Sequence, residues 1–559
     1  MKITITFQDA RFEFHHHQTI FFGRNTWRTQ QLVGLIALFL TALTNSAFLA
    51  HVKQVYYPQN VGFVVALMVI LFALNYVLLS LVSIRHTVKI VGALILVLSA
   101  VVAYHMDTFD VVIDKVMLQN VAETQTREVR DLLTLKFALY TVFLGILPAW
   151  WLLRQKVERT SVLRGFGSKL KGMIVALIVM AAAIGMFNKD MASFVREHKA
   201  VRFYTNPLTY LYSAGQFVAS RFADHSVHVE PIGMDAKIVK QSGHRTLSIL
   251  IVGETARADH WSLNGYSKLT NPLLSKEPNL VSFSNMSSCG TSTAVSVPCM
   301  FTNFGREGYS QKKFNSTENA LDVLKRAGVE VLWRDNNSSS KGVADRVTYE
   351  DYQTSKTNTV CEGGKDGECR DEGMLVGLQD YINSRPDKDI LIVLHTMGSH
   401  GPAYYKRYPK QFEHFTPTCQ DNQLEKCSQE SISNAFDNTI VYSDYVIAKT
   451  IELLKANQDK YDTSMIYMSD HGESLGENGV YLHGMPYAIA PKAQKNPAAA
   501  IWVGPKGFHG VAVDKLKPFA DKPLSHDNLF HTLLGSFEVQ SEVYKPELDI
   551  FYMAGARGY

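Results

Sequence analysis

The chain has 559 residues, which is too long for one domain of ordinary size. Its 56 basic and 52 acidic residues give a formal net charge of only +4, so the composition offers no support for nucleic-acid binding. The mean hydropathy is close to zero, but long apolar blocks fill the first third of the chain, whereas the remainder has the composition of a soluble α/β protein.

Five apolar blocks lie in the first third of the chain, and each is close to the roughly 17–25 residues that a helix needs to cross a bilayer. None of them contains an acidic residue or an arginine. Five such blocks in succession indicate membrane-spanning helices rather than the buried helices of a soluble core. The first is not followed by a convincing small-residue cleavage site, so it predicts an anchor and not a removed signal peptide. The blocks are Leu32–Leu49, Val61–Val82, Ile90–Met106, Phe137–Leu153 and Met173–Phe187.

Lysine and arginine are concentrated before the first block, between the second and third, and between the fourth and fifth. Because cytoplasmic loops of membrane proteins carry an excess of these residues, the N-terminus is predicted to be cytoplasmic. An odd number of crossings places everything after Phe187 on the opposite side, which in a bacterium is the periplasm or the outside. We therefore expect a multi-pass protein of the bacterial inner membrane with a large periplasmic part.

Residues 188–243 have a mixed, partly amphipathic composition. Segments such as Tyr210–Phe222 could lie along the membrane surface, and a plain linker is the alternative. From residue 244 onwards, strand-like and helix-like runs alternate, which predicts a mostly parallel sheet with helices on both faces. The chain thus divides into 1–187 (cytoplasmic tail and five transmembrane helices), 188–243 (linker) and 244–559 (periplasmic α/β domain). The predicted strands are Thr246–Val252, Val329–Trp333, Asp389–Leu394, Ser464–Met468 and Ala498–Val503, and the predicted helices are Ala320–Ala327 and Ser431–Leu454.

All six cysteines lie in the α/β part of the chain, in three close pairs. Six cysteines allow many pairings, of which three nearest-neighbour disulfides are the simplest. A metal cluster is the alternative, although the sequence contains no C-x-x-C. Disulfides persist in an oxidising compartment, which agrees with the side of the membrane inferred from the basic loops. The close pairs are Cys289 with Cys299, Cys361 with Cys369, and Cys419 with Cys427.

Polar residues follow three of the predicted strands. Shortly after the predicted ends of these strands come Glu254, then His395 and His400, and then the pair Asp470 and His471. Because ligands of such sheets bind beyond the carboxyl ends of the strands, these side chains are predicted to meet at one rim. Two carboxylates and an imidazole suit zinc.

Each of these residues also has an ordinary interpretation when it is taken alone. The Asp470–Gly472 segment could be a turn, His483 could lie in a surface loop, and His395 is interpreted as a buried partner rather than a ligand. His400 and His483 could instead serve a second metal or a phosphate.

The segment Ser288–Ala294 is rich in hydroxyl groups and contains Cys289. A free threonine hydroxyl is a poor nucleophile, but coordination to a metal can activate it. A Cys289–Cys299 bridge would hold such a loop in place. Taken alone, the loop would be interpreted as a Ser/Thr-rich surface loop.

Several long motifs, in the same order, resemble those of the lipid A phosphoethanolamine transferases, the group that includes the colistin-resistance enzymes. The resemblance covers essentially the whole chain, including the five apolar blocks and the cysteine spacings. The motifs are Val252–His260, Cys289–Ala294, Asn336–Gly342, His395–Pro402 and Asp470–Ser474.

This resemblance implies an α/β domain of the alkaline phosphatase and sulfatase type, with Thr293 as the nucleophile. It implies zinc as the cofactor and further residues that contact the lipid substrates. The implied zinc ligands are Glu254, Thr293, Asp470 and His471. The implied phosphate or second-zinc positions are His400 and His483, Lys341 would lie near the phosphoryl group, and Asn120 and Glu128 would lie near the donor head group.

The reaction expected from the resemblance is transfer of phosphoethanolamine from phosphatidylethanolamine to phosphate groups of lipid A, through a phosphoethanolamine-threonine intermediate. The new ammonium groups would give resistance to polymyxin and other cationic antimicrobial peptides. We expect a monomer whose partners are these membrane lipids and not nucleic acid.

Three other functions compete with this one. A sulfatase would share the fold, but Cys289–Thr293 does not match the C-x-P-x-R or S-x-P-x-R pattern of sulfatase nucleophiles. A glycerophosphate transferase of the lipoteichoic-acid type also uses a membrane anchor and a threonine. A metal-dependent sensor without catalysis is the third alternative.

Overall fold

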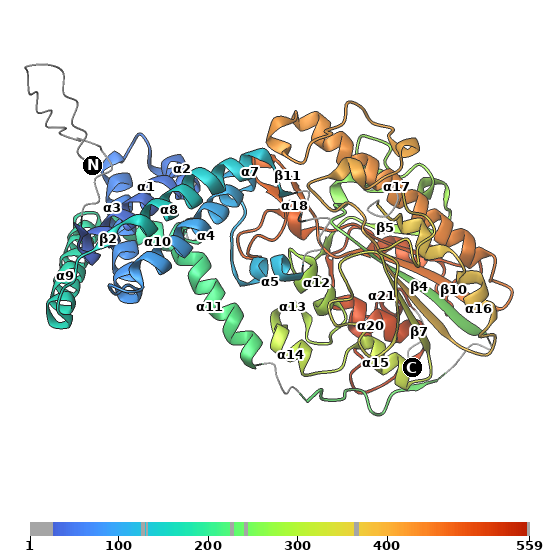
Figure 1. Cartoon of the computed structure of the whole chain (residues 1–559). Helices are drawn as coiled ribbons and strands as arrows, with labels where there is room; N and C mark the ends of the chain where they lie inside the picture. Colours follow the sequence, from blue (N-terminus) through green and yellow to red (C-terminus); the bar gives the residue numbers. More distant parts are fainter. Residues whose placement is uncertain are drawn as a thin grey trace, which may run out of the picture.

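The computed structural model describes residues 26–123, 129, 132–198, 200–223, 228–239, 244–362 and 368–555. Within these ranges, a bundle of apolar helices from the first third of the chain lies beside a larger α/β unit (Figure 1). The expected combination of apolar N-terminal helices and a mostly parallel α/β fold is therefore confirmed.

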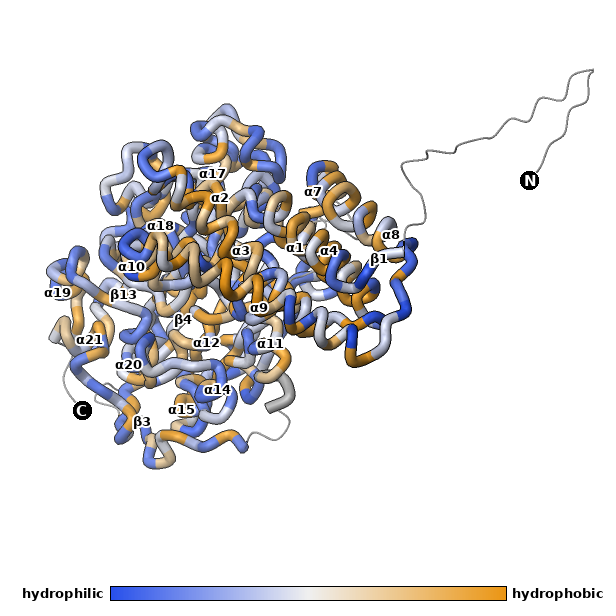
Figure 2. Tube along the Cα trace, turned by 90° about the vertical axis from the view of Figure 1, so that its left-hand side faces the viewer, coloured by the Kyte–Doolittle hydropathy of each residue, from blue (hydrophilic) through white to orange (hydrophobic). Residues whose placement is uncertain are grey.

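Four described helical spans are long and apolar enough to cross a membrane, and a bent helix pair makes a fifth if it is counted as one span. Orange colouring marks these apolar helices in Figure 2. The four are α3 (Val61–Val82), α4 (Val88–Phe109), the continuous run Leu135–Arg154 made of α7, a π-helical turn and α8, and α9 (Val162–Met186).

The first apolar block is not one straight helix. α1 (Thr29–Leu43) and α2 (Ser46–Tyr56) meet at an angle of 58°. At the break, Thr44 Oγ1 and Asn45 Nδ2 both donate to the carbonyl oxygen of Leu40, and Asn45 also exchanges two hydrogen bonds with the backbone of Asn206. Side chains that bond the backbone in this way compete with the helical hydrogen bonds, which explains the bend.

The segment that follows the apolar helices contains two further helices. These are α10 (Asn188–Glu197) and α11 (Leu208–Ala223). Asn206 between them is fully buried against the apolar helices. The first part of this segment is therefore packed against the bundle, and the predicted contact of α11 with the membrane surface stays a prediction.

A sheet of seven described strands forms the centre of the α/β unit, in the order β5-β13-β10-β4-β9-β7-β8. Neighbouring strands are parallel except at β13, which is antiparallel to both β10 and β5. All five predicted strands are present, whereas the short strands β5 and β8 were not predicted. The strands are β4 (Arg245–Gly253), β5 (Leu280–Phe283), β7 (Glu330–Asp335), β8 (Thr348–Asp351), β9 (Ile390–His395), β10 (Tyr461–Ser469) and β13 (Ala499–Val503).

Helices cover both faces of this sheet, as the alternation of elements predicts. Because successive side chains of a strand point to opposite faces, Ile249 and Ile251 of β4 join one apolar core and Leu250 and Val252 join the other. The core that contains Leu250 and Val252 includes residues of α12 (Thr293–Met300), α15 (Ala320–Arg326) and α20 (Asp527–Ser536). The core that contains Ile249 and Ile251 includes residues of α16 (Leu378–Asn383) and α17 (Gln429–Lys455).

The six cysteines form three disulfides, Cys289–Cys299, Cys361–Cys369 and Cys419–Cys427. The nearest-neighbour pairing favoured by the spacing is thus present, and no cysteine remains for a metal cluster.

The two units touch through α5 (Lys115–Glu123) and a β-hairpin. α5 contacts both α11 and α12. The hairpin of β11 (Ser474–Leu475) and β12 (Tyr481–Leu482) places Tyr481 and Leu482 against the apolar core of the helical bundle. The loop that carries His483 therefore begins at the interface between the two units.

Candidate active site and metal centre

The predicted polar residues converge at the carboxyl ends of neighbouring strands. β10 and β4 pair in parallel, and Ser469 lies opposite Gly253 where they end. The next residues along the chain, Asp470 and Glu254, therefore leave the sheet side by side. Thr255 has a φ of +54°, and its amide donates to Asp470 Oδ1 at 3.2 Å. Such backbone strain costs about 1–3 kcal/mol and persists only where surrounding contacts hold it.

Glu254, Asp470 and His471 are fully buried and turn ligand atoms toward one another. His471 Nε2 lies 3.3 Å from Glu254 Oε1 and 3.3 Å from Asp470 Oδ2. These three atoms have no hydrogen-bond partner among the described residues. The other ring nitrogen, Nδ1, bonds the carbonyl oxygen of Gly472 at 2.9 Å, so it carries the proton and leaves the Nε2 lone pair facing the carboxylates.

The electrostatics of this group fit a bound cation. Burial, and then the neighbouring Asp470 charge, raise the pKa of Glu254, and burial raises the pKa of Asp470 to about 7. Burial lowers the pKa of His471, which favours the neutral ring that a metal binds. Buried polar atoms without partners each cost about 1–3 kcal/mol, and one divalent cation would satisfy all three. Mixed oxygen and nitrogen ligands suit zinc, so the residues fit the metal suggested by the sequence.

Thr293 lies beside this group, as predicted. It is the first residue of α12, and its Oγ1 donates to Glu254 Oε2 at 3.0 Å. Asn337 Nδ2 donates to the same oxygen at 2.8 Å. Two donors therefore orient the Glu254 carboxylate, so that its other oxygen, Oε1, faces His471 Nε2. The loop before Thr293 passes close to its own helix, since a Cβ on Gly290 would lie 2.7 Å from Val295.

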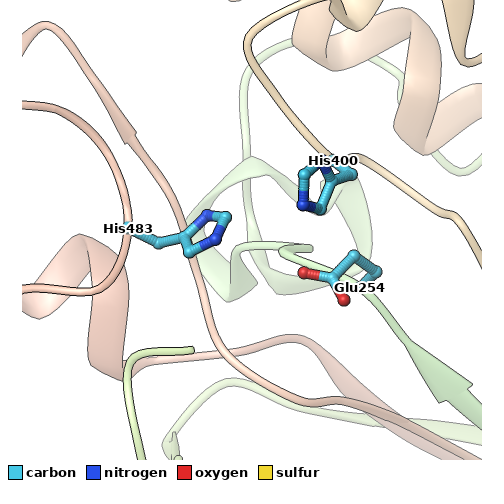
Figure 3. A group of neighbouring side chains, drawn as sticks. All are labelled: Glu254, His400 and His483. Atoms are coloured by element: carbon cyan, nitrogen blue, oxygen red, sulfur yellow. The ribbon is translucent and has the colours of Figure 1, made fainter. Parts of the chain in front are cut away.

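Figure 3 shows Glu254, His400 and His483 converging from three separate segments, and their ligand atoms also form a group that could hold a metal. The two rings lie 5.5 Å apart. His483 Nδ1 bonds Glu473 Oε2 at 2.7 Å, and the Tyr404 hydroxyl donates to Glu473 Oε1 at 2.8 Å. Burial alone would lower the pKa of His483, but the carboxylates of Glu473, Glu254 and Asp470 together raise it to about 9. A cationic ring at this position is suited to a phosphoryl oxygen.

Lys341 and His395 also lie close to the site. Lys341 has a φ of +52°, its Nζ donates to the carbonyl oxygen of Ser338 at 3.3 Å, and its positive charge acts on His400. His395 Nδ1 bonds Asp335 Oδ2 at 3.0 Å, so this histidine is a buried partner, as interpreted from the sequence.

The roles predicted for Asn120 and Glu128 near the donor head group both stay predictions, and the structure describes the position of Asn120. Asn120 lies on α5, and its Nδ2 is 3.9 Å from the position of a Cβ on Gly484, which places it beside the loop that carries His483. Glu128 lies outside the described residues, so its predicted role stays a prediction.

Two residues of the site were not among the predicted ones. Asn337 orients Glu254, and Glu473 orients His483. Both lie inside motifs that carried the family resemblance, Asn336–Gly342 and Asp470–Ser474, so the signal was present. Neither residue is a predicted metal ligand, however, and the role of each depends on which side chain it faces.

Two protein families match different parts of the chain. The family described as "Phosphoethanolamine transferase EptA/EptB" matches residues 71–222, and the family described as "Sulfatase" matches residues 246–539.

Individual relatives match almost the whole chain. The chain is 43% identical over 516 residues to "Phosphatidylethanolamine transferase Mcr-2" of Escherichia coli, covering 91% of this chain and 95% of that protein. It is 39% identical over 528 residues to "Phosphoethanolamine transferase EptA" of Escherichia coli strain K12, covering 92% and 95%. Its fold matches the structure of "Integral membrane protein lipooligosaccharide phosphoethanolamine transferase A (EptA) from Neisseria meningitidis" with a TM-score of 0.90 at 35% identity, covering 96% of this chain and 100% of that one.

Proposed function

The chain belongs to the lipid A phosphoethanolamine transferases of the Mcr and EptA type, and from this membership we propose how its own residues transfer phosphoethanolamine to lipid A. The proposal is that Thr293 takes the group from phosphatidylethanolamine and passes it to a lipid A phosphate. The observation that carries it is the Thr293 hydroxyl, 3.0 Å from Glu254 and beside three buried ligand atoms that have no hydrogen-bond partner in the described part of the chain.

Zinc is the proposed cofactor. Glu254, Asp470, His471 and the Thr293 hydroxyl would hold it with four oxygen and nitrogen ligands, the number that zinc usually takes in proteins. When bound, zinc would lower the pKa of the Thr293 hydroxyl and polarise a phosphoryl oxygen.

In the first half-reaction, Thr293 Oγ1 attacks the phosphorus atom of phosphatidylethanolamine. The oxygen–phosphorus bond to Thr293 forms, the bond to the glycerol oxygen breaks, and diacylglycerol leaves with a proton. His400, His483 and Lys341 would balance the charge on the phosphoryl oxygens. In the second half-reaction, a lipid A phosphate oxygen attacks the same phosphorus atom and releases Thr293, which is ping-pong order.

The division of the chain into 1–187, 188–243 and 244–559 supports this reaction. The apolar helices would anchor the enzyme in the bacterial inner membrane with its catalytic domain in the periplasm. Anchoring raises the effective concentration of both lipids at the site. Each transfer adds an ammonium group to lipid A, which lowers the negative charge that attracts polymyxin and other cationic peptides.

The test is the mass of the intact full-length protein after exposure to phosphatidylethanolamine. We expect an increase of one phosphoethanolamine group, mapped to Thr293, and release of diacylglycerol. Thr293→Ala should lose the adduct and roughly 1,000-fold or more of transfer, because removal of a nucleophile leaves only binding contributions.

Thr302→Ala is the matched control, because within the described ranges its hydroxyl bonds only the Cys299 carbonyl oxygen, three residues earlier. Ordinary transfer by Thr293→Ala, or no adduct under conditions that trap intermediates, would contradict the proposal. Phosphatidylglycerol in place of the donor should give no adduct.

A further inference from the structure

A cavity of about 290 Å³ lies outside the metal centre, in the part of the α/β unit that carries the nucleophile loop. We call it the basic cavity. Its walls are β6 (Met286–Ser287) with Asn285 on one side, and Tyr487 with the segment around α18 (Lys492–Lys495) on the other. The volume is at the lower limit of small-molecule pockets, so it fits part of a head group rather than a whole lipid.

Positive charge dominates the lining of the basic cavity. Lys492 and Lys495 both line it, and among the described residues neither forms an ion pair with a carboxylate. Lys495 Nζ donates to the carbonyl oxygen of Tyr487 at 3.4 Å and lies 5.3 Å from the centre of its ring. The Arg306 guanidinium lies 4.6 Å from the same ring. The Asp527 carboxylate lies beside Arg306 and offsets part of this charge. Its Oδ1 accepts a hydrogen bond from the backbone amide of Arg306 at 2.8 Å.

Hydrogen bonds connect the cavity walls to the loop that precedes Thr293. The Ser288 amide, directly after β6, donates to the Lys495 carbonyl oxygen at 2.9 Å. Ser288 is five residues before Thr293, so the wall lies within roughly 18 Å of the nucleophile along the chain. Thr291 Oγ1 donates to the Met485 carbonyl oxygen at 2.6 Å, which ties the same loop to the segment between His483 and Tyr487.

One wall of the basic cavity continues a segment that contacts the apolar helices. The segment that forms its second wall follows Tyr481 and Leu482, which pack against the apolar helices. α18 lies at the edge of the α/β unit that faces those helices (Figure 1). An acceptor that is anchored in the membrane can therefore present its head group to the metal centre and to this cavity together.

We propose that the basic cavity binds a second phosphate group of the acceptor lipid while another phosphate of the same head group attacks at Thr293. This inference rests on the proposed function, and it names the acceptor class as a head group with at least two phosphates. Lysine ammonium groups donate strong hydrogen bonds to phosphate oxygens, and a cavity without acyl-sized volume selects the polar end of a lipid. The cavity would thereby choose and orient the acceptor without taking part in bond making.

The test compares the full-length wild-type enzyme with the double variant Lys492→Ala/Lys495→Ala on two acceptors, a lipid A with two phosphates and a lipid A with one. For the diphosphorylated acceptor we expect KM to rise at least about tenfold, because the variant loses two charge-assisted hydrogen bonds to phosphate oxygens. For the monophosphorylated acceptor the change in KM should be less than about twofold, since the cavity has no second phosphate to bind.

The double variant Lys449→Ala/Lys455→Ala is the matched control, because it removes two lysines of α17 that pair with Glu452 and Glu277. It should leave both KM values unchanged. Equal KM increases for both acceptors would overturn the proposal in favour of general attraction to an anionic membrane surface. Unchanged KM values in the Lys492/Lys495 variant would also overturn it.

The adduct on Thr293 separates this proposal from the proposed function. The Lys492/Lys495 variant should form the phosphoethanolamine adduct from phosphatidylethanolamine at the wild-type rate, because the cavity acts only on the acceptor. If the wild-type protein forms no adduct, the proposed function fails. If wild type and variant form it equally but do not differ between acceptors, the acceptor site alone fails.

Discussion

Two buried groups of histidine and carboxylate side chains lie in the same α/β unit, and they differ in whether the protein completes them. In one, Asp437 bonds His260 Nδ1 at 2.7 Å through Oδ1, and through Oδ2 it bonds Lys268 Nζ at 2.7 Å and the Tyr266 hydroxyl at 3.0 Å. We call this the Asp437 group. In the other, the Glu254, Asp470 and His471 group, three ligand atoms face one another without a partner among the described residues.

The difference shows that residue type alone does not mark a metal site. Both groups combine buried carboxylate oxygens with a histidine, but among the described residues only the Glu254, Asp470 and His471 group leaves its facing atoms without partners. Buried polar groups in native proteins are nearly always paired, so an unpaired set points to something that binds there. The Asp437 group already contains its own cation, Lys268, and is complete as it stands. The three facing atoms of the Glu254, Asp470 and His471 group could be satisfied by a cation from outside the protein.

The largest expected effect on transfer comes from replacing one residue of each group by alanine. His471→Ala should remove the bound metal and lower transfer roughly 1,000-fold, because a catalytic metal contributes several kcal/mol to the transition state. Asp437→Ala should instead leave metal content unchanged and destabilise the folded state by about 3 kcal/mol, since it leaves buried partners unpaired. Metal content by mass spectrometry, transfer per folded molecule and the thermal unfolding midpoint measure these effects.

If Asp437→Ala keeps its fold but loses metal, the predicted difference in metal binding between the two groups is wrong. It is also wrong if a His471→Ala protein keeps both its metal and its activity.

A second prediction concerns the pH dependence of metal binding. Burial raises the pKa of Asp470 to about 7 in the metal-free protein, so below pH 7 a cation must displace a proton to bind. Burial also raises the pKa of Glu254, so protons compete with the cation at both carboxylates, and the apparent affinity should fall by about tenfold or more for each pH unit below 7. Competition with a chromogenic chelator between pH 5.5 and 8 measures this. An affinity that does not change with pH would mean that the carboxylate is already ionised without metal.

The smallest expected effect comes from removing the hydroxyl of one tyrosine beside each of two buried carboxylates, Glu473 and Asp437. Tyr404 donates to Glu473, which holds His483, and Tyr266 donates to Asp437. Each Tyr→Phe change removes one hydrogen bond worth about 1 kcal/mol. Tyr404→Phe should lower transfer about fivefold, whereas Tyr266→Phe should lower only the thermal unfolding midpoint. Equal losses of activity in the two variants would show that the hydroxyl of Tyr404 does not act through His483.

Local patterns along the chain were enough to predict much of the fold. The apolar blocks and the β-branched runs that became β4, β9 and β10 are read from hydrophobicity, which depends on each residue and its near neighbours. The short strand β8 and the bend between α1 and α2 were not predicted. β8 is a polar strand at the edge of the sheet, and the bend depends on Asn206, which is 161 residues from Asn45.

The sequence by itself determined the order of apolar helices and α/β elements, the cysteine pairs, and the loops in which Glu254, Thr293, Asp470 and His471 would lie. Only the tertiary structure decided which atoms of these residues face one another and which are already satisfied. The physical reason is that a ligand site depends on distances and desolvation between segments far apart in the chain. Asn337 on Glu254 and Glu473 on His483 are contacts of this kind, because each becomes visible only when the strands bring their loops to one rim.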